Sequence, residues 1–251
     1  MKKISLKNIT NKGKALLLAY DQGLEHGPTD FNDKNVDPRY ILRLAKNGGF
    51  TSVVLQKGIV EKYNEELQNS KVPLLMKLNG KTNLYRGDPI SSEICTVKEA
   101  LELGAKAVGF TIYIGSQHEE QMIEEFENIQ REAHAKGIPV VAWIYARGSS
   151  VRVRPSSELM AYASRTGLEI GADIVKVKYD GNVEGLKWAV ESAGRTKVVI
   201  AGGMKKDETL FLKQVKDIMN AGAIGLAVGR NIWQHQDPLS ITKKVKKIVW
   251  G

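Results

Sequence analysis

Short apolar runs alternate with amphipathic segments along the whole chain. The first run, 15–20, is apolar on both faces, which is typical of strands in a parallel sheet that is covered on both sides. Between the runs, apolar residues recur at helical spacing, as at Met122, Phe126 and Ile129, so a helix is expected after each strand. The expected strands span residues 14–21, 51–56, 73–78, 105–113, 138–145, 171–179, 197–201 and 223–228.

Local signals predict where several helices begin and end. Asp37 followed by Pro38 predicts an N-cap and a first helical residue, and the same helix is expected to end at Gly48-Gly49. The patterns Thr-x-x-Glu at 96–99 and Ser-x-x-Glu at 116–119 match the capping box, in which the first and fourth residues exchange hydrogen bonds. Two further expected features are a helix near 59–67 and a long polar loop over 79–95.

The number of strand–helix units predicts the fold class. Eight units in 251 residues match the count and size of a (β/α)8, or TIM, barrel. A doubly wound α/β sheet is the structural alternative, but the loop after the first strand, 21–28, lacks the Gly-x-Gly-x-x-Gly fingerprint of that fold. No linker or change of composition divides the chain. We therefore expect one (β/α)8 domain spanning residues 1–251.

The sixth expected strand, 171–179, carries two lysines. Because side chains alternate along a strand, Val175 and Val177 share one face, and Lys176 and Lys178 share the other. In a covered sheet that second face is buried, and burial beside another cation favours the neutral amine, which attacks carbonyls to form Schiff bases. An edge strand with two solvated lysines is the structural alternative, because lysine is rarely fully buried. Lys178 lies nearer the rim, and Lys176 lies one layer deeper.

Polar residues follow most of the expected strands. In TIM barrels the active site forms where the C-terminal ends of the strands meet. One polar residue at a strand end is often only a solvated rim side chain, whereas the convergence of many is harder to explain in that way. The residues expected to converge are Asp21, His26, Gln56, Lys57, Lys77, Asn79, Tyr113, Trp143, Tyr145, Arg147, Lys176 and Lys178.

Glycines follow both of the last two strands. Gly202-Gly203 comes after the seventh strand, and Gly229-Arg230 comes after the eighth. These two loops often bind phosphate in TIM barrels, because glycine lets backbone N–H groups approach the phosphate oxygens. Arg230 adds a charged guanidinium, which can donate two parallel hydrogen bonds to a phosphate. A Gly-Gly pair alone is a weak signal, since tight turns use it often, but glycines in both loops predict a phosphate site.

The charge balance narrows the class of partner. Lysine and arginine number 37 against 28 acidic residues, a formal net charge of +9 that favours acidic partners. The basic residues of the last helix, Lys243, Lys244, Lys246 and Lys247, are expected to be a solvated helix face. No basic groove interleaved with aromatics indicates nucleic-acid binding, and no apolar run is long enough to span a bilayer. We therefore expect a phosphorylated small molecule, and neither nucleic acid nor a membrane, as partner.

Cysteine content and the N-terminal residues bear on cofactors and location. Cys95 is the one cysteine, which excludes an internal disulfide and a cysteine-cluster metal site. No other metal-ligand spacing is present, so no metal and no cofactor are expected. Residues 1–14 are polar and basic, without the apolar core of a signal peptide, so a cytoplasmic location is expected.

Four separated motifs are similar to one known family. They are Leu-Ala-Tyr-Asp-Gln-Gly-Leu-Glu-His-Gly-Pro at 18–28, Trp-Ile-Tyr-Ala-Arg-Gly at 143–148, Ala-Asp-Ile-Val-Lys-Val-Lys-Tyr at 172–179 and Ala-Val-Gly-Arg-Asn at 227–231. Together they resemble the archaeal-type class I fructose-bisphosphate aldolases, from about residue 14 to the C-terminus. The resemblance implies a metal-independent, homo-oligomeric TIM-barrel lyase of glycolysis and gluconeogenesis. It would cleave fructose 1,6-bisphosphate reversibly to dihydroxyacetone phosphate and glyceraldehyde 3-phosphate.

The resemblance also implies roles for the matched positions. Lys176 would form the Schiff base, Tyr145 would be the general acid and base, and Asp21 would be the supporting carboxylate. The binding positions would be Gly202, Gly203, Gly229 and Arg230 for one phosphate, His26, Trp143 and Arg147 along the substrate channel, and Lys178 as an electrostatic neighbour.

Two departures from the family pattern leave other activities open. Gln22 stands where many members have histidine, and Ala201 replaces a serine, an exchange expected to weaken one phosphate contact. The family also includes 2-amino-3,7-dideoxy-heptulosonate synthases and a thiolase that acts on a phosphorylated dione. The Glu-His-Gly-Pro sequence at 25–28 resembles the aldolases more closely. A non-catalytic barrel that binds a partner or nucleic acid is the alternative from another class.

Overall fold

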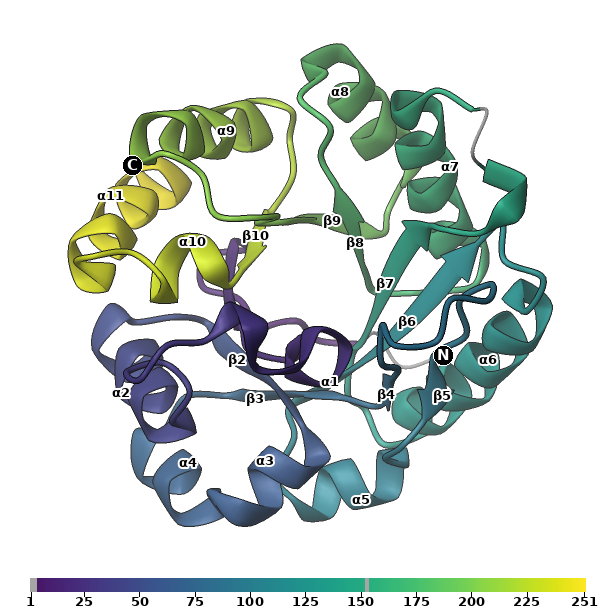
Figure 1. Cartoon of the computed structure of the whole chain (residues 1–251). Coiled ribbons are helices and arrows are strands. Elements are labelled where there is room, and N and C mark those ends of the chain that lie inside the picture. The colour runs from purple at the N-terminus through teal and green to yellow at the C-terminus, as the bar shows by residue number, and fades with distance from the viewer. Residues whose placement is uncertain (1–3, 152–153) are drawn as a thin grey trace.

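Eight parallel strands close into a barrel in the computed structural model, which describes residues 4–151 and 154–251 (Figure 1). Each strand pairs in parallel with its two neighbours, and the register of Ala15 with Gly225 closes the ring. The predicted (β/α)8 class is confirmed. Around the ring the strands are β1 (Ala15–Ala19), β10 (Gly225–Val228), β9 (Lys197–Ala201), β8 (Ile174–Lys178), β7 (Val140–Ala146), β6 (Ala107–Ile114), β3 (Leu74–Lys77) and β2 (Ser52–Gln56).

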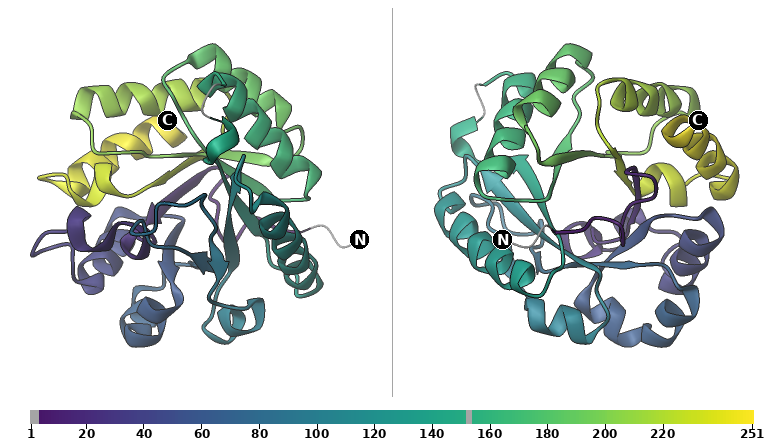
Figure 2. Two further views of the ribbon diagram at one scale, coloured as in Figure 1. Left: turned by 45° about the vertical axis from the view of Figure 1, so that its right-hand side comes forward. Right: turned by 180° about the vertical axis from the view of Figure 1, so that it is seen from behind.

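Helices surround the barrel as an outer layer (Figures 1 and 2). The helix expected near 59–67 is two helices, which meet at Tyr63. Two short helices, α1 (Gly23–His26) and α10 (Arg230–Trp233), and the 3₁₀ turn η1 (Gly27–Asp30) follow strand ends. The outer helices are α2 (Pro38–Gly48), α3 (Lys57–Lys62), α4 (Asn64–Ser70), α5 (Val97–Glu102), α6 (Glu119–Ala135), α7 (Ser156–Glu169), α8 (Val183–Ser192), α9 (Glu208–Asn220) and α11 (Pro238–Trp250).

Strand alternation separates two apolar layers, one between strands and helices and one inside the barrel. Val175 and Val177 pack in the outer layer with residues of the helices, as the pattern predicts. Ile174 packs inside the barrel with Leu17 and Val141. Since Lys176 is two residues after Ile174 on the same strand, its side chain points into the barrel interior as well.

The N-terminal end of the barrel is closed by the segment before β1. Ile9 is fully buried within the inner apolar cluster, and Leu6 packs against the same cluster. Seen from behind in Figure 2, this purple segment lies across the ring of strands. The opposite end, where the strands have their C-termini, is therefore the one that opens to solvent.

Two of the three predicted helix starts are confirmed. The Asp37 side chain accepts from the Arg39 backbone N–H, and α2 ends at Gly49, whose φ of 64° is left-handed. At the start of α5, the Thr96 side chain accepts from the Glu99 N–H while the Glu99 carboxylate accepts from the Thr96 N–H, which completes a capping box.

The third predicted capping box, at 116–119, is wrong. The hydroxyl of Ser116 donates to the Pro89 carbonyl at 2.7 Å, and α6 begins after His118 without a side-chain cap. The Glu119 carboxylate accepts instead from the Gly115 N–H. A long-range contact with the 79–95 segment has therefore replaced the local cap.

The expected polar loop over 79–95 is held in place at both ends and in the middle. Its ends pair as a short antiparallel ladder of β4 (Asn79–Gly80) and β5 (Ser92–Glu93). Near its tip, the Asp88 carboxylate accepts from the backbone N–H groups of Gln117 at 2.9 Å and Ser149 at 3.1 Å. The segment is thereby tied to the loops that follow β6 and β7. Over the described residues, no helix has the length and apolar character that crossing a membrane requires.

Candidate active site

A cavity of about 590 Å³ opens at the C-terminal end of the barrel and has lining residues from all eight strands or the loops that follow them. Its volume is in the range of small-molecule sites. The prediction was wrong for Lys57, which pairs with Glu99 of α5 and does not line the cavity. All the residues to which the family resemblance assigns a role do line it: Asp21, His26, Trp143, Tyr145, Arg147, Lys176, Lys178, Gly202, Gly203, Gly229 and Arg230.

The two lysines of β8 have different environments. Lys176 is 6% exposed, whereas Lys178, the last residue of the strand, is exposed at the rim. Burial lowers the pKa of the Lys176 amine below its ordinary value, although the charges of Asp21 and Glu25 oppose this shift. In a covered sheet both lysines were expected to face the interior, with Lys178 nearer the rim. The structure buries Lys176 and leaves Lys178 exposed, because the strand ends at Lys178.

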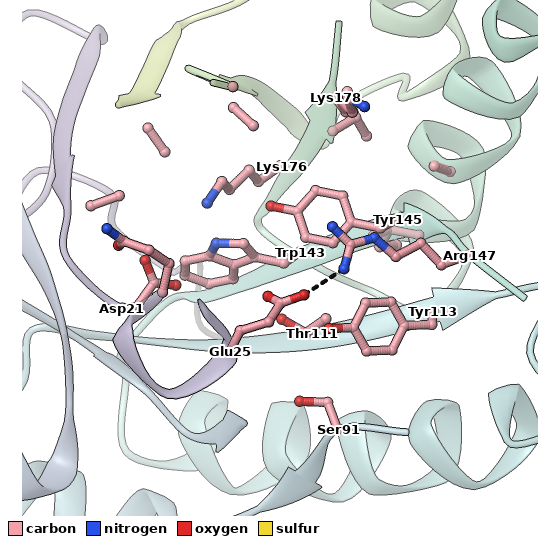
Figure 3. Close-up of a pocket in the computed structure, with 18 of the residues that line it drawn as sticks. Asp21, Glu25, Ser91, Thr111, Tyr113, Trp143, Tyr145, Arg147, Lys176 and Lys178 are labelled. Atoms are coloured by element: carbon pink, nitrogen blue, oxygen red, sulfur yellow. Dashed lines mark hydrogen bonds and ion pairs between the residues drawn. The ribbon is translucent and has the colours of Figure 1, made fainter. Parts of the chain in front are cut away.

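Tyr145 and Asp21 approach the Lys176 amine from different sides. In Figure 3 the Lys176 amine and the Tyr145 hydroxyl both point into the cavity from the same side, while Asp21 projects into it from the opposite side. Burial, and secondly the charge of Asp21, raise the pKa of the Tyr145 phenol. The phenol therefore holds its proton in the free protein and becomes a strong base once the proton has left.

Trp143 forms the floor of the cavity beneath these groups. Its indole packs against Gly109 of the neighbouring strand so closely that a Cβ at position 109 would lie 1.7 Å from the ring. The Lys176 amine lies 5.0 Å from the centroid of the indole ring and the Lys77 amine 5.7 Å. The indole nitrogen is buried and has no hydrogen-bond partner among the described residues, so it is a donor available to a bound molecule.

A second buried amine belongs to Lys77, at the end of β3. Its Nζ donates to the backbone oxygen of Asn79 at 2.7 Å and to the side-chain oxygen of the same residue. Burial lowers the pKa of this amine to about 7; Asp21 opposes the shift and the positive charge of Lys176 adds to it. The sequence led us to expect Lys178, on the same strand, as the second amine beside Lys176. In the structure the buried second amine is instead that of Lys77, on β3.

On one side of the cavity mouth, Arg147 pairs with Glu25 of α1. Its guanidinium lies 5.6 Å from the ring centroid of Tyr113 and 5.5 Å from that of Tyr145. Burial opposes ionisation of Glu25, but the charge of Arg147 and its hydrogen bond outweigh burial and lower the pKa of the carboxyl. The ion pair with Glu25 holds the Arg147 guanidinium over the rings of Tyr113 and Tyr145 at the entrance of the cavity.

The side of the mouth formed by His26 and Arg230 contains a carboxylate that sequence reasoning missed. Nδ1 of His26 lies 2.6 Å from Oδ2 of Asp30, and NH1 of Arg230 lies 3.4 Å from Oδ1 of the same carboxylate. His26 and Arg230 line the cavity, and Asp30 contacts both of them. Asp30 thus fixes the direction of two side chains expected to meet the substrate.

The glycine loops pack too tightly for side chains at two positions. A Cβ at Gly202 would lie 2.7 Å from the Val228 side chain, and one at Gly229 would lie 2.7 Å from the Ala19 carbonyl. Gly203 has a φ of 74°, the left-handed region that favours glycine. The backbone N–H of Gly202 already donates to Ala227 at 2.9 Å, so it is engaged within the sheet.

Asn231 joins the two glycine loops. It is 3% exposed, and its side-chain nitrogen donates to the backbone oxygens of Gly202 at 2.8 Å and Met204 at 2.9 Å. Its side-chain oxygen accepts from the Lys206 N–H. This residue therefore holds the loop after β9 against the start of α10. Within residues 4–151 and 154–251, no three His, Cys, Asp or Glu side chains are grouped as metal ligands would be.

Comparison with known sequences places the chain in a family. The profile of the DeoC/LacD family aldolases matches residues 15–235. The chain belongs to this family. Among its aldolase relatives is the class 1 fructose-bisphosphate aldolase of Thermoproteus tenax, which is 49% identical, with 98% of this chain and 93% of the relative covered. The class 1 enzyme of Halobacterium salinarum is 44% identical, with 96% of this chain and 92% of that enzyme covered.

Solved structures of this aldolase family match the fold closely. An archaeal fructose-1,6-bisphosphate aldolase, whose catalytic lysine is covalently bound to the carbinolamine intermediate of its substrate, is 48% identical with a TM-score of 0.93 and 98% coverage of both chains. The deoxyribose phosphate aldolase of Aeropyrum pernix, 17% identical with a TM-score of 0.58, shares the fold alone; 93% of this chain and 90% of that one are covered. The resemblance inferred from the four sequence motifs is confirmed.

Proposed function

We propose that this chain is a class I fructose-bisphosphate aldolase that works as one (β/α)8 domain. It cleaves fructose 1,6-bisphosphate reversibly to dihydroxyacetone phosphate and glyceraldehyde 3-phosphate through a Schiff base. The observation that carries the proposal is the buried amine of Lys176, with a lowered pKa, which points into the same cavity as the Tyr145 hydroxyl. The 49% identity to a class 1 fructose-bisphosphate aldolase over nearly the whole chain supports the choice of substrate.

The reaction begins with the free amine of Lys176. Its nitrogen adds to the C2 carbonyl of the open-chain ketose, the Tyr145 phenol gives its proton to the carbonyl oxygen, and the phenolate takes a proton from the nitrogen, which yields a carbinolamine. The re-formed phenol then protonates the C2 hydroxyl, which leaves as water, so that an iminium ion and the Tyr145 phenolate remain. Lys176 supports this sequence because burial keeps a share of its amines neutral, and only the neutral amine has the electron pair for the attack.

Carbon–carbon cleavage follows at the iminium stage. A base removes the proton of the C4 hydroxyl, C4 becomes the aldehyde carbon, and the electrons of the C3–C4 bond move into the iminium to form an enamine. Tyr145 is our choice for the base, since a phenol with a raised pKa is strongly basic after it has lost its proton. Asp21 projects into the same space and supports proton movement at the lysine.

Release of the second product reverses the steps that formed the Schiff base. The enamine takes at C3 the proton that Tyr145 gained during cleavage. Water adds to the resulting iminium, one of its protons returns to Tyr145, and Lys176 leaves as the amine, giving dihydroxyacetone phosphate. Gly203, Gly229 and Arg230 hold a phosphate at one side of the cavity, and the amide of Gly202 supports the loop from within the sheet. His26, Trp143 and Arg147 line the channel, and Trp143 offers its unpartnered indole N–H to a substrate oxygen.

Cleavage of fructose 1,6-bisphosphate, followed by coupled detection of the two triose phosphates, tests the proposal. Activity is expected to persist in EDTA, since the iminium draws the electrons that a bound metal would otherwise draw. A relative from Methanocaldococcus jannaschii, 37% identical with 95% of this chain and 81% of the relative covered, is named a fructose-bisphosphate aldolase/6-deoxy-5-ketofructose 1-phosphate synthase. Turnover of a 6-deoxy ketose phosphate without cleavage of the bisphosphate would favour that second activity.

The cellular setting of the enzyme is part of the same proposal. Triose phosphates and fructose 1,6-bisphosphate place the reaction in glycolysis and gluconeogenesis, and we assign the enzyme to the cytoplasm as a homo-oligomer. The net charge of +9 suits an anionic sugar phosphate. Sedimentation of the purified protein measures its oligomeric state, and a monomer at working concentration would contradict that part.

A further inference from the structure

Two glutamine side chains of the cavity carry polar atoms that the reaction steps above leave unpaired. Gln22 directly precedes α1, Gln56 is the last residue of β2, and both line the cavity. Nε2 of Gln22 and Oε1 of Gln56 are buried, and neither has a hydrogen-bond partner among the described residues. Since an unpaired buried polar atom costs free energy, each is a point where a bound molecule can supply the missing partner.

The two amides belong to one wall of the cavity. β1 and β2 are paired neighbours, and their ladder continues past β1 because the Tyr20 N–H donates to the Val54 carbonyl at 3.1 Å. Nε2 of Gln56 donates to the backbone oxygen of Asn79 at 3.2 Å, and because a carbonyl only accepts, this bond fixes which end of the amide is the unpaired oxygen. The wall therefore offers a donor from Gln22 and an acceptor from Gln56.

This combination of donor and acceptor fits a hydroxyl group. A hydroxyl donates one hydrogen bond and accepts others, so it can satisfy both amides at once. A carbonyl oxygen or a fully ionised phosphate only accepts, and would leave the oxygen of Gln56 unpaired, whereas a methylene group would leave both amides unpaired. The wall is therefore suited to a sugar hydroxyl.

The position of the wall indicates which hydroxyl it meets. β2 lies opposite β8, four strands away in either direction around the ring. In the proposed reaction, Lys176 and the loops after β9 and β10 hold the dihydroxyacetone phosphate half, which leaves the far wall to the aldehyde half. In that half the C4 hydroxyl gives its proton to Tyr145, so the C5 hydroxyl is the one that remains for the two amides.

We propose that Gln22 and Gln56 determine specificity for the aldehyde: Gln22 donates to the C5 hydroxyl of the ketose, and that hydroxyl donates to Gln56. C5 of the ketose is C2 of the released aldehyde, so the ligand class is a phosphorylated 2-hydroxyaldehyde. This role rests on the proposed aldolase function. An aldehyde that lacks the hydroxyl leaves both amides unpaired and is disfavoured.

The test is the choice between two aldehydes in the direction of synthesis. Dihydroxyacetone phosphate is supplied with glyceraldehyde 3-phosphate or with 3-oxopropyl phosphate, which lacks only the 2-hydroxyl, and kcat/KM is measured for each aldehyde. The wild type should prefer the hydroxylated aldehyde. Gln22→Met and Gln56→Met keep the length of the side chain and remove the amide. Each should lower the preference about ten-fold, through a loss of kcat/KM for glyceraldehyde 3-phosphate alone.

Two further variants sharpen the comparison. Gln22→His supplies a ring N–H donor, so it should retain more of the preference than Gln22→Met. Gln117→Met is the matched control, because Gln117 is an exposed glutamine after β6 that does not line the cavity. It should keep the wild-type preference.

Covalent trapping of dihydroxyacetone phosphate on Lys176 with borohydride separates this role from the Schiff-base chemistry, because that ketose has no C5 hydroxyl. Its rate should be the same in Gln22→Met and Gln56→Met as in the wild type, which also shows that both variants are folded. An unchanged preference in either variant, an equal loss with both aldehydes, or slower trapping would overturn the specificity role. Absence of any adduct and of any turnover in the wild type would contradict the aldolase function instead.

Discussion

The ionisable groups in the inner layer of the site and those at its rim have different surroundings. We define the inner layer as Lys77, Trp143, Tyr145 and Lys176, and the rim as Glu25, His26, Arg147, Lys178 and Arg230. In the inner layer neither lysine forms an ion pair among the described residues, and burial lowers the pKa of both amines. At the rim, Glu25 pairs with Arg147, and Asp30 contacts both His26 and Arg230.

This difference in environment matches two different tasks, bond-breaking chemistry in the inner layer and substrate recognition at the rim. A reactive amine must lose its proton near neutral pH, and burial without an ion-pair partner favours this even though the charge of Asp21 opposes it. A group that binds phosphate must stay charged and point in one direction, which a carboxylate partner achieves. Substitutions in the inner layer should therefore lower kcat, whereas substitutions at the rim should mainly raise KM.

The largest effect is expected for Lys176→Ala. Loss of the nucleophile removes the covalent path, so kcat for fructose 1,6-bisphosphate cleavage should fall by about 10⁴-fold or more. Borohydride reduction with dihydroxyacetone phosphate should leave an adduct on Lys176 in the wild type and none in the variant, as located by peptide mass spectrometry. Substantial turnover by the variant would remove Lys176 from the chemistry.

Tyr145→Phe should have the second-largest effect. The change keeps the ring that contacts Arg147 and deletes the hydroxyl that points into the cavity with Lys176. Because positioned proton transfer contributes on the order of 10²–10⁴-fold, kcat should fall by about 10²-fold or more, while KM changes little and the fold is kept. Turnover close to wild type would move the proton-transfer role to another group, with Asp21 the first to test.

The barrel and most site positions could be predicted because they depend on local patterns. Alternation along β8 places Lys176 opposite Val175 and Val177, and the rule that barrel sites form at C-terminal strand ends gathers the polar residues. The Thr96 capping box was also predictable, since all of its partners lie within four residues. The alternation along β8 and the Thr96 capping box each link residues that are close in sequence, and both were confirmed.

The features that were missed depend on contacts between distant segments. Ser116 carries a capping pattern, but its hydroxyl is engaged by Pro89 of another loop. Asp30 matters because α10 passes beside η1, which no local pattern indicates. Lys77 was expected among the converging residues, yet its place beside Lys176 follows from the ring closure that brings both amines to Trp143.

A smaller and different effect is expected for Arg230→Ala at the rim. The variant loses a charge-assisted contact with phosphate, so KM for fructose 1,6-bisphosphate should rise about ten-fold or more, with a smaller fall in kcat if the contact also aligns the reacting carbons. Arg230→Lys should recover only part of the loss, because an ammonium lacks the planar fork. Unchanged kinetic constants in Arg230→Ala would exclude this side chain from the phosphate site.

Lys178→Ala should have the smallest effect, and it tests the comparison most sharply because Lys178 shares a strand and a face with Lys176. The two side chains are separated by about two strand rises, or ~6.6 Å. Lys178 is exposed, and water screens its charge from the interior, so kcat is expected to change by less than about three-fold. Trapping should weaken slightly, with the adduct still on Lys176. An adduct that forms on Lys178 in the wild type, or a loss of kcat in Lys178→Ala as large as in Tyr145→Phe, would show that the chemistry reaches the rim.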